Sequence, residues 1–353
     1  MSYSSGSSSS SLNGPTAGAF RFNTDSSQLE IYDGNQWTGV VSDSPELQTG
    51  GTRGLFMGGY GGPAPTLNRD NINYINMATT GNAADFGDLS TPTRSNNSFA
   101  SRTRALSFGG QAPGFVDTIE YVTITSTGNV TDFGNISDGA GWATGCSDQT
   151  RGVMGAMYHS SGGSVHVNTM EYLTIAQTGN TIDFGDLTHA RLGRAASFSS
   201  PTRGVWGGGD DPSGDTNIID FITIATTGNA ADFGDLVNAR NQLGACSNAV
   251  RGLFAGGYDW AAPVSTNNNN IEYITIASLG NTLDFGDLSV AVAGTSGMAS
   301  PTRGCFGGMW VHPAGVTNAI EYVQLMTTGN AIDFGDLVVA LFGGTCSNGH
   351  GGL

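Results

Sequence analysis

Residues 119–134 read IEYVTITSTGNVTDFG, and versions of this phrase occur six times along the chain. It contains a β-branched and aromatic run from Ile119 to Ile124, a Gly-Asn turn and the tripeptide Asp132-Phe133-Gly134. The other copies carry the Asp-Phe pair at 85–86, 183–184, 232–233, 284–285 and 333–334. An arginine precedes each copy, at Arg53, Arg104, Arg151, Arg203, Arg251 and Arg303. Their spacing is close to fifty residues, a period that predicts a solenoid, a propeller or another repeat array.

Each repeat is expected to contain four strands, as the fifth copy illustrates. Residues 242–247 are mostly small and suit a crowded innermost strand, and residues 251–257 (RGLFAGG) form an apolar run that ends in a glycine pair. Residues 271–276 (IEYITI) are β-branched and aromatic, as expected of a strand between two neighbouring sheets. A turn at 279–281 then leads into an outer strand at 282–288 (TLDFGDL).

The repeats resemble kelch repeats. An apolar strand closing in Gly-Gly occurs at 58–59, 109–110, 207–208, 256–257 and 307–308, and the third copy departs from this with Gly155-Ala156. An aromatic residue follows in the next strand of every copy (Tyr74, Tyr121, Tyr172, Phe221, Tyr273 and Tyr322). Kelch repeats usually carry tryptophan in the last strand, where this chain has phenylalanine. The resemblance covers about residues 50–353 and implies an all-β fold, a six-bladed kelch-like β-propeller with four-stranded blades.

The order of the strands predicts how this ring closes. The chain enters at a second-type strand, residues 52–58, and leaves after an innermost-type strand, residues 342–348. We therefore expect the C-terminal strand to pair with residues 52–58 and complete the first blade of a propeller spanning residues 50–353. Closure of this kind removes the open sheet edges that promote aggregation.

Composition excludes several functional classes. The net charge is −16, the thirteen basic residues are all arginine, and the chain contains no lysine. Nucleic-acid backbones are bound by dense positive charge, so nucleic acid is not an expected partner. P-loop nucleotide binding, Schiff-base chemistry and protein-kinase catalysis each need lysine. No apolar run is long enough to span a bilayer, no cofactor is expected, and the protein is predicted not to be an enzyme.

Several polar groups have alternative interpretations. The six repeat arginines could bind anions, but we expect them to pair with repeat acids such as Asp186, Asp235 and Asp287. The cysteines at 146, 246 and 346 occupy equivalent innermost-strand positions and are expected to be unbridged core thiols, with redox or metal roles as the alternative. The acidic run of Asp210, Asp211 and Asp215 is consistent with a calcium site or with a plain acidic turn.

The loops between the second and third strands vary most among the repeats. They contain the candidate ligand- or partner-binding residues Tyr60, Tyr158, His159, Trp260, Trp310 and His312. Exposed aromatic side chains there could stack on sugars or contact a protein partner, and ordinary loop packing is the alternative.

The segment before the repeats predicts attachment to a larger particle. Residues 1–15 are a serine-rich tail, expected to be flexible, without the features of a secretory signal. Residues 18–40 (GAFRFNTDSSQLEIYDGNQWTGV) resemble a segment of bacteriophage tail and fibre proteins, and the repeat unit is similar to tandem repeats of marine phage proteins. We expect a small anchoring hairpin at 16–45, with the anchoring residues Phe20, Phe22, Leu29, Tyr32 and Trp37.

These resemblances imply a non-enzymatic virion structural protein of a bacteriophage: a tail, baseplate, fibre or capsid appendage assembled in the host cytoplasm. Its expected partners are other virion proteins, through residues 1–45, and a host-surface glycan or receptor. A carbohydrate-binding host-recognition module is the main alternative, followed by a protein-interaction scaffold. Because the repeat spacing alternates between long and short, we expect a pseudo-threefold axis with long loops at 60–70, 157–169 and 258–270. This rhythm either has a function or only records gene duplication.

Overall fold

The computed structural model describes residues 15–23, 28–39, 51–61, 67–159, 165–191, 195–260 and 266–353. The chain divides into two compact units, Met1–Ser44 and Pro45–Leu353. The described residues form strands, turns and loops without a helix, so the predicted all-β class is confirmed. Within these ranges there is accordingly no helix long and apolar enough to cross a membrane. The predicted serine-rich tail lies outside the described residues except for Pro15.

The first unit is a small antiparallel sheet of three strands, β1 (Phe20–Asn23), β2 (Gln28–Tyr32) and β3 (Trp37–Gly39). Phe20 lies opposite Ile31 across the first pair of strands, and Tyr32 lies opposite Trp37 across the second. The expected hairpin is therefore extended by a third strand, because the turn after Tyr32 also reverses the chain. Two backbone N–H groups of this turn donate to the Asp33 carboxylate, which lowers its pKa.

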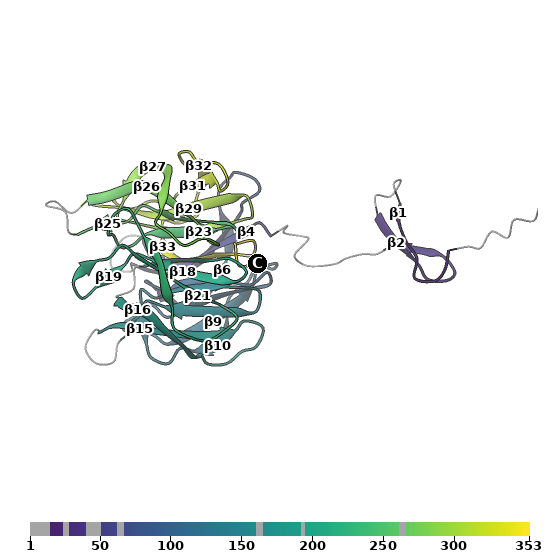
Figure 1. The fold of residues 1–353 in the computed structure, drawn as a ribbon, viewed down its shortest axis with the longest axis horizontal. Helices are drawn as coiled ribbons and strands as arrows, with labels where there is room; N and C mark the ends of the chain where they lie inside the picture. Colours follow the sequence, from purple (N-terminus) through teal and green to yellow (C-terminus); the bar gives the residue numbers. More distant parts are fainter. Residues whose placement is uncertain are drawn as a thin grey trace, which may run out of the picture. The chain divides into compact units, whose positions relative to one another are not determined.

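The second unit contains six antiparallel sheets built on the same set of four strands, to which some add short strands, and they are numbered I to VI here along the chain (Figure 1). Sheet I consists of β33 (Phe342–Ser347), β4 (Arg53–Tyr60), β5 (Asn68–Asn76) and β6 (Ala84–Thr93). Sheet II consists of β7 (Asn97–Ala100), β8 (Arg104–Phe108), β9 (Thr118–Thr123) and β10 (Thr131–Asn135). Sheet III consists of β12 (Thr144–Ser147), β13 (Arg151–Gly155), β15 (Val165–Thr174) and β16 (Ile182–Arg191).

The other three sheets repeat the same order of strands. Sheet IV consists of β17 (Ala196–Ser199), β18 (Arg203–Gly207), β21 (Ile218–Thr223) and β22 (Ala231–Asp235). Sheet V consists of β23 (Gly244–Ser247), β24 (Arg251–Ala255), β26 (Thr266–Thr275) and β27 (Leu283–Val292). Sheet VI consists of β28 (Gly294–Ala299), β29 (Arg303–Val311), β31 (Ala319–Gln324) and β32 (Ile332–Asp336).

Short strands extend the loops of these sheets: β11 (Ala140–Gly141), β14 (Tyr158–His159), β19 (Asp210–Asp211), β20 (Gly214–Asp215), β25 (Tyr258–Asp259) and β30 (Gly315–Val316). The third and fourth strands are nine or ten residues long in sheets I, III and V, and five or six in sheets II, IV and VI. This alternation in strand length agrees with the alternation of long and short repeats in the sequence. Parts of the three predicted long loops, residues 62–66, 160–164 and 261–265, lie outside the described residues.

The C-terminal strand joins the first sheet. Strand β33 pairs antiparallel with β4, with Cys346 opposite Leu55 and Ser347 opposite Gly54. The predicted pairing of residues 342–348 with residues 52–58 is therefore confirmed. The first strands of the six sheets also contact one another in closed order, β33 to β7, β12, β17, β23, β28 and back to β33.

The hydrophobic core is divided into six clusters, and each lies between two successive sheets. The cluster between sheets I and II, for example, packs Leu55 and Phe86 against Val122 and Ile124. The last cluster packs Phe56 and Ile75 of sheet I against residues of sheet VI. The phenylalanine of every Asp-Phe-Gly copy is buried in such a cluster and makes an edge contact with the aromatic residue of the third strand. The tripeptide is therefore a packing motif.

Each Gly-Asn turn joins its sheet to the preceding one, which explains why this dipeptide recurs. In the turn of sheet V, the Gly280 N–H donates to the Phe233 carbonyl oxygen, and the Asn281 side chain accepts from the Asp235 N–H. The same two bonds occur at all six junctions, including the one between sheets VI and I. A Cβ atom on Gly234 would lie 2.5 Å from the Gly280 backbone, so only glycine fits there.

The repeat arginines also join neighbouring sheets, but not through carboxylates. Each guanidinium lies over the third-strand aromatic ring of its own sheet and donates to a backbone carbonyl of the next sheet. Arg303 of sheet VI donates to the Met77 carbonyl of sheet I at 2.9 Å. The predicted pairing with Asp186, Asp235 and Asp287 is wrong, because in the described part of the chain no ion pair joins them to the repeat arginines and each guanidinium donates instead to the backbone oxygen of a buried residue in the adjacent sheet.

Candidate functional site

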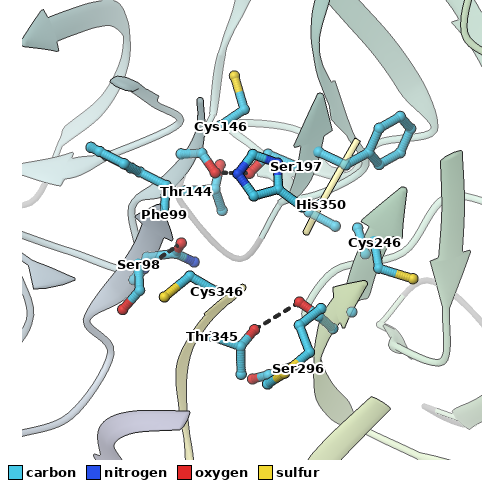
Figure 2. Close-up of a pocket in the computed structure, with 18 of the residues that line it drawn as sticks. Ser98, Phe99, Thr144, Cys146, Ser197, Cys246, Ser296, Thr345, Cys346 and His350 are labelled. Carbon is cyan, nitrogen blue, oxygen red and sulfur yellow. Dashed lines mark hydrogen bonds between the residues drawn. The ribbon is translucent and has the colours of Figure 1, made fainter. Parts of the chain in front are cut away.

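The first strands of the six sheets surround a cavity of about 140 Å³. Figure 2 shows labelled side chains from these strands around its open centre. Small residues predominate because six strands converge on one line, as the sequence indicated for residues 242–247. Where hydroxyls occur, several bind the neighbouring sheet: Ser147 donates to the Ala100 carbonyl, Ser199 to the Ser147 carbonyl and Ser247 to the Ser199 carbonyl.

Thiols and larger apolar side chains alternate along the ring of first strands. Cys146, Cys246 and Cys346 lie in sheets III, V and I, while Phe99, Phe198 and Met298 occupy the equivalent positions in sheets II, IV and VI. All four cysteines of the chain are buried and unbridged, as predicted for Cys146, Cys246 and Cys346. Burial raises the pKa of each thiol, to about 12 for Cys305. They are therefore protonated, weak nucleophiles near neutral pH.

The C-terminal residues close one end of the cavity. The His350 ring lies at the ends of β7 and β12, with Nε2 2.7 Å from the Ala100 carbonyl oxygen and Nδ1 accepting from the Gly352 N–H. Burial lowers the pKa of His350 to about 4, so the ring is neutral at physiological pH. A Cβ atom on Gly352 would lie 1.9 Å from the Ser147 carbonyl oxygen, which shows how closely this segment covers the strand ends.

Two of the six predicted loop residues lie in one aromatic cluster. Trp260 follows β25 and is 55% exposed, with its ring centroid 4.8 Å from that of Tyr258. His312 lies on the other side, 6.3 Å from the Tyr258 ring. The Trp260 backbone N–H donates to the Asp215 carboxylate at 2.6 Å, which attaches this loop to the β19–β20 hairpin. Tyr258, which links the two predicted residues, was missed from the sequence.

Tyr158 and His159 belong to a second cluster. Strand β14, which consists of these two residues, pairs with β11, and the Tyr158 ring contacts the rings of Phe115 and Trp142. His159 Nδ1 lies 3.5 Å from the Asp138 carboxylate. Tyr158 and His159 are partly buried and act as packing partners. In this cluster it is Trp142, which sequence reasoning missed, that borders the cavity.

The remaining two predicted loop residues lie apart from both clusters. Tyr60 ends β4, and the Arg94 guanidinium lies 5.9 Å from its ring. Trp310 lies in β29 opposite Gly294 and Val316 and is partly buried. The six candidates therefore do not form one site.

The acidic run of Asp210, Asp211 and Asp215 attaches the β19–β20 hairpin to a neighbouring loop. Asp210 and Asp215 face each other across the β19–β20 hairpin, and both accept from the Asn241 side-chain amide at 2.7 Å. The described residues contain no group of three His, Cys, Asp or Glu side chains that could hold a metal ion.

Two buried arginine pairs were not expected from the sequence. Arg191 of sheet III pairs with Asp220 of sheet IV at 2.6 Å, and Arg240 pairs with Glu272 of sheet V at 2.8 Å. Burial lowers the pKa of both guanidinium groups, and the adjacent carboxylates oppose this effect. The sequence does carry a signal that could have revealed these arginines: in these two repeats an Ala-Arg dipeptide follows Asp-Phe-Gly-Asp-Leu after a few residues.

In comparisons with known proteins, the chain matches no family model, and no curated protein matches it.

Proposed function

We propose that residues 50–353 form a six-bladed kelch-like β-propeller, and that the protein is a non-enzymatic structural component of a bacteriophage virion. Support for the propeller comes from the six sheets built on the same four strands, the six cores between successive sheets and the pairing of β33 with β4. The arginine bonds add to this, because the bond from Arg303 to Met77 continues the series from the sixth sheet to the first.

The virion assignment rests mainly on the N-terminal unit. A sheet of three short strands needs a hydrophobic face that becomes buried to be stable alone. Phe20 is 63% exposed, and Arg21 pairs with Glu30 while its guanidinium lies 4.4 Å from the Trp37 ring. Tyr32 and Trp37 are partly buried against each other, and the side chains of Phe22 and Leu29 lie outside the described residues. A small sheet with an exposed aromatic residue is consistent with an anchor whose apolar face is covered by another virion protein.

The test is incorporation into particles. A chain lacking residues 1–45 should fold, with strand-rich circular dichroism and cooperative unfolding, but should be missing from particles purified from the phage's host. Phe20→Ser in the full chain should weaken incorporation, whereas Trp260→Ala, outside the anchor, should not. Normal incorporation of the truncated chain would contradict the anchoring role and the assignment that rests on it.

A carbohydrate-binding host-recognition module is the second candidate function. The observation that favours it is the exposed Trp260 ring beside Tyr258 and His312, because solvent-facing aromatic rings flanked by polar groups suit the apolar faces of sugars. Glycan-array binding by the full chain, lost in Trp260→Ala, would support this function. Binding to no glycan would leave protein contact as the function of these loops.

A further inference from the structure

A buried acid of the third strand faces the preceding sheet at five of the six junctions between sheets. It lies directly before the third-strand aromatic residue, and the acids of sheets II to VI are Glu120, Glu171, Asp220, Glu272 and Glu321. Sheet I has Asn73 at this position. Because a buried carboxylate is costly unless it is hydrogen-bonded or paired with a charge, the partners of these acids can be compared from one junction to the next.

At the junctions III–IV and IV–V the acid pairs with a buried arginine, Arg191 or Arg240. Arg191 Nη2 donates to the Asp220 carboxylate at 2.6 Å. Its Nη1 donates to the carbonyl oxygens of Gly208 and Ile218 at 2.9 and 3.0 Å. One carboxylate and two backbone carbonyls on the sheet IV side therefore form a binding site for a guanidinium group.

The junction between sheets I and II has the same acceptors but a threonine in place of the arginine. Its equivalents of Arg191, Asp220, Gly208 and Ile218 are, in that order, Thr93, Glu120, Gly109 and Thr118. Thr93 is the last residue of β6, as Arg191 is of β16. The Gly109 N–H donates to the Thr118 carbonyl, and the same bond joins the two equivalent residues of sheet IV. The acceptor backbone is therefore alike at both junctions, and only one of them contains a guanidinium.

A cavity of about 60 Å³ lies at the junction between sheets I and II. Its lining includes the four equivalent residues, Thr93, Glu120, Gly109 and Thr118, together with Ser90 and Thr91. The last two are exposed, so the cavity is reached from solvent beside the end of β6. The remaining lining residues, Leu89, Ser107 and Val116, are uncharged. The volume is several times the roughly 10–15 Å³ that one water needs, which leaves room for a small planar ion.

Glu120 has weaker partners than the equivalent acids. Its side chain is buried, and among the residues that the structure describes its carboxylate accepts only from the Ser90 N–H, at 3.4 Å. By contrast, the Glu171 carboxylate accepts three hydrogen bonds, from Ser137 and Thr181. Glu120 is thus a buried carboxylate that faces a cavity without a matching donor, and a cation in that cavity would satisfy it.

The two arginines closest to Thr93 do not supply this cation. Arg94 follows Thr93 directly, but its Nε donates to the Gln111 side chain at 3.0 Å. Arg69 lies opposite Thr93 in the β5–β6 ladder. Neither arginine lines the cavity, and none of the ion pairs in the described ranges includes Glu120.

We propose that the cavity between sheets I and II binds a guanidinium group supplied by another molecule, either a small guanidino compound or an arginine side chain of a protein partner. The group donates to the Glu120 carboxylate and to the carbonyl oxygens of Gly109 and Thr118, as Arg191 does at the equivalent acceptors. A planar guanidinium reaches these acceptors together, whereas a compact ammonium ion does not. The net charge of −16 favours the approach of a cation. The site does not depend on the virion assignment.

The experiment is calorimetric titration of the purified full chain with methylguanidinium chloride and with N-acetyl-arginine amide, at constant ionic strength. Ligand stays below about 50 mM, where guanidinium salts denature little. Methylguanidinium should bind with a dissociation constant of roughly 0.1–10 mM, as its few heavy atoms allow. Binding of both probes is expected for an arginine side chain as the natural ligand, and binding of methylguanidinium alone for a small compound.

Glu120→Gln should weaken binding at least about tenfold, because it removes the charge and keeps the shape. Glu321→Gln is the matched control. It changes the equivalent acid of sheet VI, which already accepts from the Ser289 N–H at 3.0 Å and has Val292 at the arginine position. The affinity of Glu321→Gln should equal that of the wild type.

A second readout needs no added ligand. Thr93→Arg places a guanidinium in the cavity from within the chain, so it should abolish methylguanidinium binding and raise the melting temperature by roughly 2–4 °C. Glu120→Gln in the same chain should cancel this gain, as a double-mutant cycle would show.

The proposal is overturned if neither probe binds at about 50 mM, five times the weakest expected constant. It is also overturned if Glu120→Gln binds methylguanidinium as tightly as the wild type does, because the ligand would then lie elsewhere. Equal binding of ammonium chloride would overturn the selection of a guanidinium. These titrations are decisive whatever the stability of Thr93→Arg, and none of them bears on incorporation into particles.

Discussion

Replacing Arg303 with methionine should destabilise the second unit, because this arginine joins its last sheet to its first. Its Nη1 donates to the carbonyl oxygen of Met77, a fully buried residue, and its Cζ lies 4.8 Å from the Tyr322 ring centroid. Leaving the buried carbonyl unpaired costs about 1–3 kcal/mol. Loss of the cation–π contact costs about 0.5–1 kcal/mol at a partly exposed site. We therefore expect the free energy of unfolding to fall by about 1.5–4 kcal/mol.

Urea denaturation followed by circular dichroism and tryptophan fluorescence measures this change. Met326→Ala is the control: Met326 is 54% exposed, and surface substitutions usually change stability by less than about 0.5 kcal/mol. Arg303→Lys should lie between the wild type and Arg303→Met, since an ammonium group can donate to the carbonyl but lacks the planar surface that lies over the ring. A loss below about 0.5 kcal/mol in Arg303→Met would refute the role assigned to these arginines.

Four further outcomes are expected. Deleting residues 342–353 removes the strand that pairs with β4 and should lower the melting temperature by roughly 10 °C or more; an unchanged value would contradict closure. Gly234→Ala should destabilise by at least about 1 kcal/mol more than Gly329→Ala, because both have positive φ but only the first would bring a Cβ against the adjacent turn; equal losses would show that the turn contact is unimportant. His350 has a folded pKa of about 4, below its ordinary 6.5, so its contribution to stability is complete above pH 6.5 and is lost as the pH falls toward 4; His350→Gln should reduce this slope, and identical pH profiles would refute it. The four cysteines should resist alkylation at pH 8 until urea is added, and rapid native labelling or any disulfide in a non-reducing mass map would be inconsistent with their burial.

Much of the fold could be predicted because the same local sequence pattern, and therefore the same local structure, recurs six times. The phrase around Asp132-Phe133-Gly134 predicts two strands joined by a turn wherever it occurs, and its β-branched run leaves few alternatives. Strand limits were less accurate. The third strand of sheet V was expected at 271–276 but begins at Thr266, since polar Asn residues there extend the ladder beyond the apolar run.

The candidate site was harder to predict, because its residues are recruited from different repeats. Trp142 is unique among its equivalents, so repetition gave no signal for it, and its position depends on the pairing of β11 with Tyr158 of a later loop. The six loop aromatics were selected for residue type alone. Only the folded chain separates Trp260 and His312, which share a cluster, from Tyr60 and Trp310, which lie elsewhere.

The sequence by itself determined the all-β class, the six repeats and the return of the last strand to the first sheet, since periodicity and hydrophobic patterning are local properties that need no knowledge of distant contacts. Only the tertiary structure decided which partner each repeated polar group takes. The arginines bind carbonyls rather than carboxylates, because the packing of neighbouring sheets places a buried backbone oxygen within hydrogen-bond distance of each guanidinium. The cavity also belongs to the tertiary structure alone, because it exists only where six separate strands meet.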